Sequence, residues 1–160
     1  MKHSVMLDTS FFIRLLNDAD PLHSNAIGYF KYFLENEINL KVSTISIAEY
    51  CVLGKLEDLP LKNIQILPFN LKDAERTGEF AKIIFNENKI SIDKLSPRAI
   101  IPNDSKLFAQ FDLDNTVSHF VTSDVRSKST LALLRNGIGP KFDIISIDIP
   151  YSETFGILDL

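Results

Sequence analysis

The chain has 160 residues, a hydrophobic content of 45%, a charged content of 24% and a formal net charge of −4. These values are typical of one globular domain with a sizeable core, and they argue against a disordered chain; no apolar run approaches the length of a membrane span. The negative charge disfavours a protein that binds nucleic acid over a large basic face, but it is compatible with a nuclease whose acidic site binds a metal.

Cysteine content and the N-terminal segment predict a cytoplasmic location. The single cysteine, Cys51, cannot form an internal disulfide, which fits a reducing compartment. Its apolar neighbours predict a buried side chain rather than a nucleophile. The segment before Asp8 is too short and too soon interrupted for a signal peptide.

Short β-rich runs alternate with helical patterns, which favours parallel βαβ units. In chain order we predict a strand at about His3–Asp8, helices at Thr9–Asn17 and Pro21–Asn36, a strand at Leu40–Thr44, a helix from Ser46 to about Gly54 and a strand at Ile64–Phe69. A helix at Leu71–Asn86, with Ala74, Phe80, Ala81, Ile84 and Phe85 inward, precedes an irregular stretch at 87–102 that contains Pro97 and Pro102. A helix from about Asn103, a strand at His119–Ser123, a helix at Val125–Asn136, a strand at Phe142–Asp148 and an irregular tail from Pro150 complete the chain.

Four acidic residues stand where a strand ends or near the predicted beginning of a helix: Asp8, Glu49, Asp104 and Asp124. The carboxyl ends of parallel strands meet at one edge, where open α/β sheets have their sites. Four carboxylates at one edge repel one another and need a hard divalent cation to remain ionised together. The pattern therefore indicates a metal-dependent phosphodiesterase site.

Each acid also has a structural explanation, because Asp is a favoured N-cap and acids near a helix N-terminus gain from its dipole. Asp8 and Asp124 directly precede predicted helices, and Ser46–Glu49 fits the capping-box template. Against capping alone, the apolar runs before Asp8 and Asp124 favour central strands, where clefts form. Glu49 lies on the apolar stripe of its helix, where a solvated acid is unusual.

Two basic residues share the same offset from an acid. Lys106 follows Asp104 by two positions and Arg126 follows Asp124 by two, each in the first turn of a helix, where the dipole disfavours a cation. They are candidates for contacts with substrate phosphates, and a solvated charge or a local ion pair is the other explanation. The histidines have no ligand spacing, so no His-based metal site is predicted.

Four segments resemble the motifs of the PIN-domain nucleases, a family that includes the VapC-like ribonuclease toxins. They are Val5–Ser10 (VMLDTS), an apolar strand that ends in Asp-Thr-Ser; Thr44–Tyr50 (TISIAEY), a helix with an acid after a Ser/Thr-rich entry; Asn103–Ala109 (NDSKLFA), an Asp that opens a helix; and Phe120–Asp124 (FVTSD), a strand followed by Thr-x-Asp. Their order and spacing over residues 5–148 make the combination specific. The spacing also selects Asp104 over Asp93, which would leave a longer gap before Asp124.

The resemblance implies one PIN-like domain over residues 1–160, a three-layer α/β/α sandwich with a mainly parallel five-stranded sheet in the order 3-2-1-4-5. It implies a metal-dependent endoribonuclease that hydrolyses RNA phosphodiester bonds with Mg²⁺ or Mn²⁺, and the toxin of a toxin–antitoxin pair is one form of such an enzyme. Asp8, Glu49, Asp104 and Asp124 are then the catalytic and metal-binding acids. Thr9 and Thr122 match positions that support them.

Two other functional classes stay open. A PIN-like module that binds RNA or protein without cleaving it would have the same fold, although the complete acidic set argues against it. A phosphotransfer domain fits less well. A haloacid-dehalogenase-like protein needs a second Asp two residues after the first, where this chain has Ser10, and a receiver needs an acidic pair before its phosphorylated Asp, where it has Lys2 and His3.

The helix predicted at 21–36 has four aromatic residues within five positions: Tyr29, Phe30, Tyr32 and Phe33. Phe30 and Phe33 fit its inward stripe, whereas Tyr29 and Tyr32 lie partly to the side. Aromatic residues are enriched in interface cores. We therefore expect a homodimer or a complex with a small antitoxin-like protein, with cover by other helices of the same domain as the alternative. RNA is the expected substrate, and no membrane partner is expected.

Overall fold

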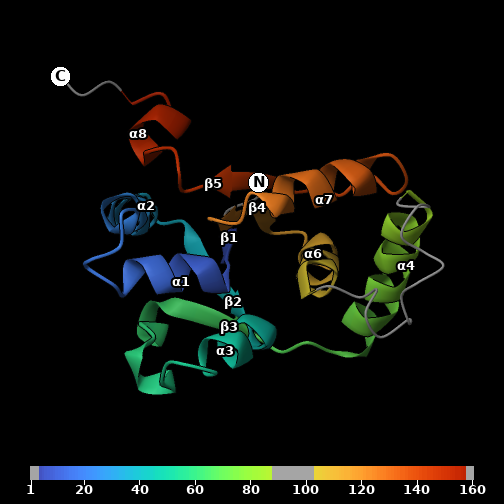
Figure 1. Cartoon of the computed structure of the whole chain (residues 1–160), viewed down its shortest axis with the longest axis horizontal. Helices are drawn as coiled ribbons and strands as arrows, with labels where there is room; N and C mark the ends of the chain where they lie inside the picture. Colours follow the sequence, from blue (N-terminus) through green and yellow to red (C-terminus); the bar gives the residue numbers. More distant parts are fainter. Residues whose placement is uncertain (1–3, 88–102, 158–160) are drawn as a thin grey trace.

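A parallel sheet forms the centre of the molecule. The computed structural model describes residues 4–87 and 103–157, shown in Figure 1. The strands are β1 (Ser4–Leu7), β2 (Asn39–Ser43), β3 (Ile64–Leu67), β4 (Val117–Thr122) and β5 (Asp143–Ser146). They form one five-stranded sheet in the order β3-β2-β1-β4-β5, and every neighbouring pair is parallel. The predicted order 3-2-1-4-5 is confirmed.

Helices flank the sheet on both sides, as expected for a three-layer sandwich (Figure 1). On one side lie α1 (Thr9–Leu15), α2 (His23–Glu35) and the short α8 (Tyr151–Thr154), and on the other lie α4 (Leu71–Glu87), α6 (Asn103–Leu113) and α7 (Arg126–Arg135). The helix α3 (Thr44–Tyr50) follows β2, and two 3₁₀ turns, η1 (Leu56–Asp58) and η2 (Leu61–Asn63), lead from it to β3.

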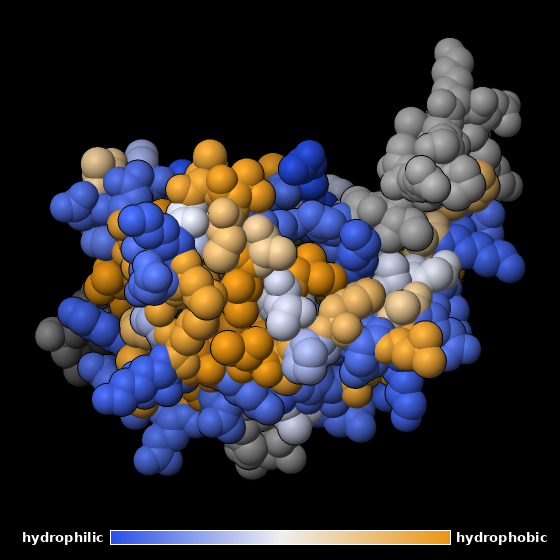
Figure 2. Space-filling model, turned by 90° about the horizontal axis from the view of Figure 1, so that it is seen from below, coloured by the Kyte–Doolittle hydropathy of each residue, from blue (hydrophilic) through white to orange (hydrophobic). Residues whose placement is uncertain are grey.

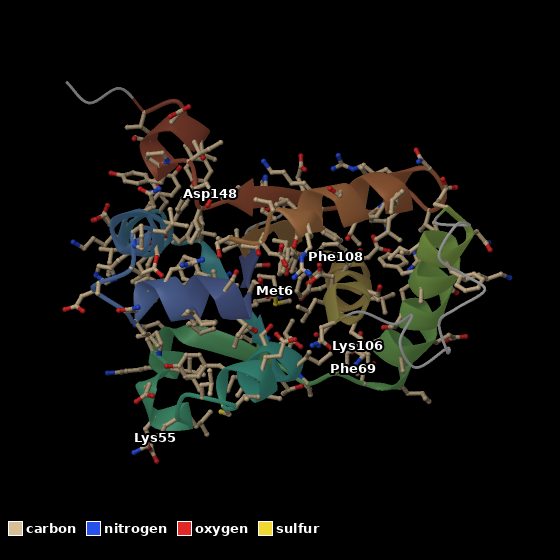
Figure 3. All side chains as sticks on the ribbon, viewed as in Figure 1. Met6, Lys55, Phe69, Lys106, Phe108 and Asp148 are labelled. Atoms are coloured by element: carbon tan, nitrogen blue, oxygen red, sulfur yellow. The ribbon has the colours of Figure 1, made fainter. Side chains whose placement is uncertain are left out.

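The central strand β1 separates two hydrophobic cores. Val5 and Leu7 pack into the core beneath α1 and α2, whereas Met6 packs into the core beneath α4, α6 and α7. Figure 3 shows Met6 and Phe108 between the sheet and α6. Successive strand side chains point to opposite faces, so a strand covered on both faces is apolar throughout. This burial fixes the register of β1 and therefore the position of Asp8 directly after it.

Several predicted bounds are wrong. The helix α3 begins at Thr44 rather than Ser46, because the Ser43 hydroxyl caps it by accepting a hydrogen bond from the Ile45 amide. The tail from Pro150 is not irregular, since it contains α8.

Two predictions of burial are also wrong. Cys51 is exposed, and it directly follows the end of α3. Ala74 is also exposed. Of the irregular stretch predicted at 87–102, Glu87 belongs to α4 and the remainder lies outside the described residues.

The aromatic residues of α2 pack largely within the chain. Tyr29 and Phe33 are fully buried, so Tyr29 rather than Phe30 shares the inward face with Phe33. Tyr32 stacks on Phe155, with ring centroids 4.4 Å apart, and Phe30 is half-buried. The Tyr29 hydroxyl donates to the Ile149 carbonyl. The segment around α8 thus covers aromatic rings that the sequence analysis assigned to an interface. These rings therefore give no support to a homodimer or partner interface on α2.

No helix within residues 4–87 and 103–157 is long and apolar enough to cross a membrane.

Replacing Tyr29 with Phe should lower the free energy of unfolding by about 1–2 kcal/mol, because the Ile149 carbonyl and the Thr154 hydroxyl lose their hydrogen-bond partner while the ring packing is kept. Urea denaturation measures this change. The matched control is Tyr32→Phe, whose hydroxyl makes no hydrogen bond within the described residues and whose loss should cost less than about 0.5 kcal/mol. Equal losses for the two variants would contradict an anchoring role for the Tyr29 hydroxyl.

Candidate active site

Asp8 is held at the carboxyl edge of the sheet, directly after β1. Its amide donates to the Val121 carbonyl of β4, and its side chain is only 8% exposed. It occupies the N-cap position of α1, but its carboxylate makes no capping hydrogen bond. Instead, Oδ2 accepts hydrogen bonds from the hydroxyls of Ser10 and Thr122, each at 2.8 Å. Capping therefore does not explain Asp8.

Glu49 lies in the last turn of α3, not near the beginning of a helix as the sequence suggested. Because α3 begins at Thr44, the proposed Ser46–Glu49 capping box does not form. One carboxylate oxygen of Glu49 accepts a hydrogen bond of 2.6 Å from the Thr9 hydroxyl. The other accepts one from the Asn103 side-chain amide. Glu49 is thus fixed by residues from the beginnings of α1 and α6.

Asp104 is the second residue of α6. This helix runs back along the sheet toward the beginning of β4, so its own beginning lies at the carboxyl edge. Asp124 follows β4 by two residues at the same edge. Its Oδ1 accepts a hydrogen bond of 2.9 Å from the Arg126 amide at the beginning of α7, although the N-cap residue of this helix is Val125.

The structure brings all four acids to one cavity of about 460 Å³. They reach it from different elements: the end of β1, the end of α3, the beginning of α6 and the loop after β4. Its described lining consists of Asp8, Thr9, Ser10, Ile13, Glu49, Asn103, Asp104, Asp124, Arg126 and Thr130.

The other predicted residues lie around this cavity. Thr9 lines it and holds Glu49, while Thr122 is buried beneath it and holds Asp8. Arg126 lines it beside Asp124. Lys106 does not line it; this residue lies in the first turn of α6 (Figure 3), with its ammonium 3.4 Å from the Asn103 side-chain oxygen.

Sequence reasoning missed Ser10 and Asn103 as site residues. The Ser10 hydroxyl donates to Asp8 and accepts a hydrogen bond from the Ser123 amide, so it links the ends of β1 and β4. Its position two residues after Asp8, within hydrogen-bonding reach of that carboxylate, was the available signal. The contact between Asn103 and Glu49 joins residues 54 positions apart, and no local pattern predicts it.

The pKa values of the carboxyl groups reflect mutual repulsion and burial. Loss of solvation, followed by the charges of Asp8 and Asp124, raises the pKa of Asp104 to about 6. Burial likewise raises the pKa of Asp8, against the lowering effect of its two hydroxyl donors. By contrast, hydrogen bonds from Arg126 lower the pKa of Asp124. Ionisation of Asp104 therefore lowers the stability of the folded protein more clearly than ionisation of any other acid at this site.

The donor set has the chemistry of a site for a hard cation. Carboxylate oxygens are the ligands that Mg²⁺ and Mn²⁺ prefer, and the cavity leaves space for the water ligands that Mg²⁺ retains. In the part of the chain that the structure describes, however, no three acidic, histidine or cysteine side chains form a ready-made metal cluster. Glu49 and Asp124 are each hydrogen-bonded through both carboxylate oxygens. The acids therefore share a cavity without converging on one point.

Asp104→Asn should stabilise the metal-free protein in a pH-dependent way. The pKa of about 6 lies above the unfolded value of 3.8, so the folded state loses stability as pH rises through this window and Asp104 ionises. Asn stays neutral. The variant should melt about 2–4 °C higher than the wild type at pH 7.5 in EDTA and at the same temperature at pH 4. Calorimetry at the two pH values measures this, and an equal effect at both would contradict the electrostatic cause.

Solved structures with a similar fold include VapC and VapBC proteins. VapBC2 from Rickettsia felis, bound to a DNA fragment from its promoter, is 16% identical over 89% of this chain and 98% of its own, with a TM-score of 0.56. VapC20 from Mycobacterium tuberculosis, a sarcin-ricin loop cleaving toxin, is 13% identical over 78% and 93%, with a TM-score of 0.53. DNA-bound VapBC from Salmonella typhimurium is 15% identical over 92% and 99%, also with a TM-score of 0.53.

No protein-family model and no curated protein matches the sequence. At 13–16% identity, the likeness to solved structures establishes the fold. The sheet order, its parallel strands and its flanking helices agree with that likeness. The chain therefore has the PIN-like fold of the VapC toxin structures.

Proposed function

We propose that this protein is a metal-dependent endoribonuclease that hydrolyses RNA phosphodiester bonds. The observation that supports this function best is the convergence of Asp8, Glu49, Asp104 and Asp124 on one cavity at the carboxyl edge of the sheet. The four acids come from four separate elements, and burial, followed by repulsion from Asp8 and Asp124, raises the pKa of Asp104. Such an arrangement is stable at neutral pH when a cation neutralises it.

In this proposal the four acids bind Mg²⁺ or Mn²⁺, with Asp8 and Asp124 as the direct ligands and with Asp104 and Glu49 binding directly or through water. A bound divalent cation would supply Lewis-acid activation of water and neutralise charge on the phosphate. Ser10 and Thr122 orient the Asp8 carboxylate from one side, which leaves its other oxygen for a ligand. Thr9 orients Glu49 in the same way.

Two basic side chains, those of Arg126 and Lys106, are proposed to contact substrate phosphates. Arg126 lines the cavity and has an 84% exposed side chain, so its guanidinium can meet a phosphate at the opening. Lys106 lies one turn into α6 beside Asn103, at the border of the same cavity. RNA as the substrate rests on the likeness to VapC20, a sarcin-ricin loop cleaving toxin. The alternative is a PIN-like module that binds RNA or protein without cleavage.

A small antitoxin is the proposed protein partner, because two of the similar structures are VapBC complexes. An apolar groove is continuous with the acidic cavity, since Ile13 and Glu49 line both. Its apolar lining also includes Leu16, Val52 and Leu53, which are 41%, 77% and 98% exposed. Figure 2 shows hydrophobic side chains gathered at the centre of the face that carries α3 and the following turns. A partner segment with apolar residues next to a basic residue fits both surfaces.

Cleavage of single-stranded RNA should require Mn²⁺ or Mg²⁺ and should fall at least about 100-fold in Asp8→Asn, because a neutral amide replaces an anionic ligand of similar shape. A gel-based cleavage assay with and without EDTA measures it. The matched control is Asp143→Asn, which removes an exposed acid paired with Arg135 away from the cavity and should cleave like the wild type. RNA binding without cleavage by the wild type would favour the non-catalytic module.

Leu53→Glu should weaken the complex with an antitoxin at least about tenfold while leaving RNA cleavage unchanged, because this side chain is 98% exposed in the groove and lies outside the acidic cavity. Calorimetry with the product of a small neighbouring gene measures the affinity, and light scattering of the chain alone tests for a homodimer. An unchanged affinity would exclude the groove as the docking surface.

A further inference from the structure

The guanidinium of Arg126 binds the Asp124 carboxylate through both of its oxygens. Nε lies 3.2 Å from Oδ1 and Nη2 lies 3.1 Å from Oδ2, and the Arg126 backbone amide donates to Oδ1 as well. Parallel contacts of a guanidinium with both carboxylate oxygens are the strongest geometry available to such a pair. The lone pairs that Asp124 would offer to a cation are thus already directed at a cation of the same chain.

Arg126 is the only basic side chain among the described residues that line the cavity. Arg126 therefore neutralises part of the acidic cavity from within. It occupies a position where a first-turn cation opposes the helix dipole of α7, and so the helix itself does not explain its presence.

The ion pair between Arg126 and Asp124 can open without a change in the backbone. The Arg126 side chain is 84% exposed and that of Asp124 is 27% exposed, and ion pairs so open to water contribute little to stability. The two residues are separated by one position, so rotation of the arginine side chain alone releases the carboxylate. No displacement of α7 or β4 is required, because the backbone hydrogen bond from Arg126 to Asp124 is independent of the guanidinium.

From this geometry we propose that Arg126 competes with the divalent cation for Asp124. In the metal-free protein Arg126 is the internal counter-ion of this carboxylate, and metal binding frees the guanidinium to face the opening of the cavity. The inference rests on the proposed metal-dependent function. It also accounts for acids that share a cavity without forming a ready-made cluster, since Arg126 engages both oxygens of one of them.

The test is the affinity of the RNA-free protein for Mn²⁺, measured by electron paramagnetic resonance. Arg126→Gln should bind Mn²⁺ about two- to fivefold more tightly than the wild type. Arg126→Lys keeps the charge but loses the two-point contact, so it should show a smaller gain. The matched control is Arg135→Gln, which removes the same charge nine residues further along α7, about 13 Å away and screened by salt. The control should bind like the wild type.

A second measurement follows the guanidinium directly. The NMR signal of the Arg126 Nε–H group should move on addition of diamagnetic Mg²⁺ toward its position in metal-free Asp124→Asn, while the Arg135 signal should stay in place. Unchanged Mn²⁺ affinity in Arg126→Gln, or an equal gain in Arg135→Gln, would overturn competition while leaving the metal site intact. If the wild type and Asp8→Asn are alike in failing to bind Mn²⁺, the proposed function fails and competition fails with it.

Discussion

The placement of four carboxylates in one partly buried cavity is the constraint on which the site depends. The parallel sheet delivers Asp8 and Asp124 to the carboxyl edge, and the helices that begin or end there add Asp104 and Glu49. Burial makes the larger contribution at Asp8 and Asp104, because a carboxylate removed from water loses the solvent that stabilises its charge, and repulsion from neighbouring carboxylates adds to it. The result is a cavity in which ionisation of Asp8 and Asp104 lowers the stability of the folded protein, most clearly at Asp104. A fold tolerates such a cost where the charges have a use.

The surrounding residues reduce this cost in two different ways. Hydroxyl groups fix the orientation of Asp8 and Glu49, because Ser10, Thr122 and Thr9 donate to single carboxylate oxygens. Arg126 instead supplies a full positive charge at the edge of the cavity. The hydroxyls are buried or half-buried and define positions, whereas the guanidinium is exposed and can leave. Rigid orientation and a movable charge thus meet at one site.

The apolar side chains near the surface fall into a covered group on α2 and an exposed group after α3. On the α2 side the short helix α8 and Phe155 cover the aromatic rings, and Tyr29 anchors this cover through its hydroxyl. On the α3 side, Val52 and Leu53 stay exposed beside the acidic cavity. Burial of the first surface stabilises the monomer, while exposure of the second has no stabilising role in the free chain. The groove with these exposed apolar side chains shares Ile13 and Glu49 with the acidic cavity.

The amino-acid sequence by itself determined the alternation of strands and helices, the sandwich and the four candidate acids, because these follow from local signals, whereas the strand order was implied by the resemblance to the PIN-domain nucleases. Apolar runs that end in an acid, helix-starting motifs and their spacing are all readable along the chain, and both faces of a buried strand are apolar. Only the tertiary structure decided that Glu49 ends a helix rather than capping one, that Asn103 holds it, and that the C-terminal segment covers Tyr32. Each of these depends on contacts between residues far apart in the chain. No pattern of neighbouring residues specifies such contacts, since they are set by how whole helices pack on the sheet.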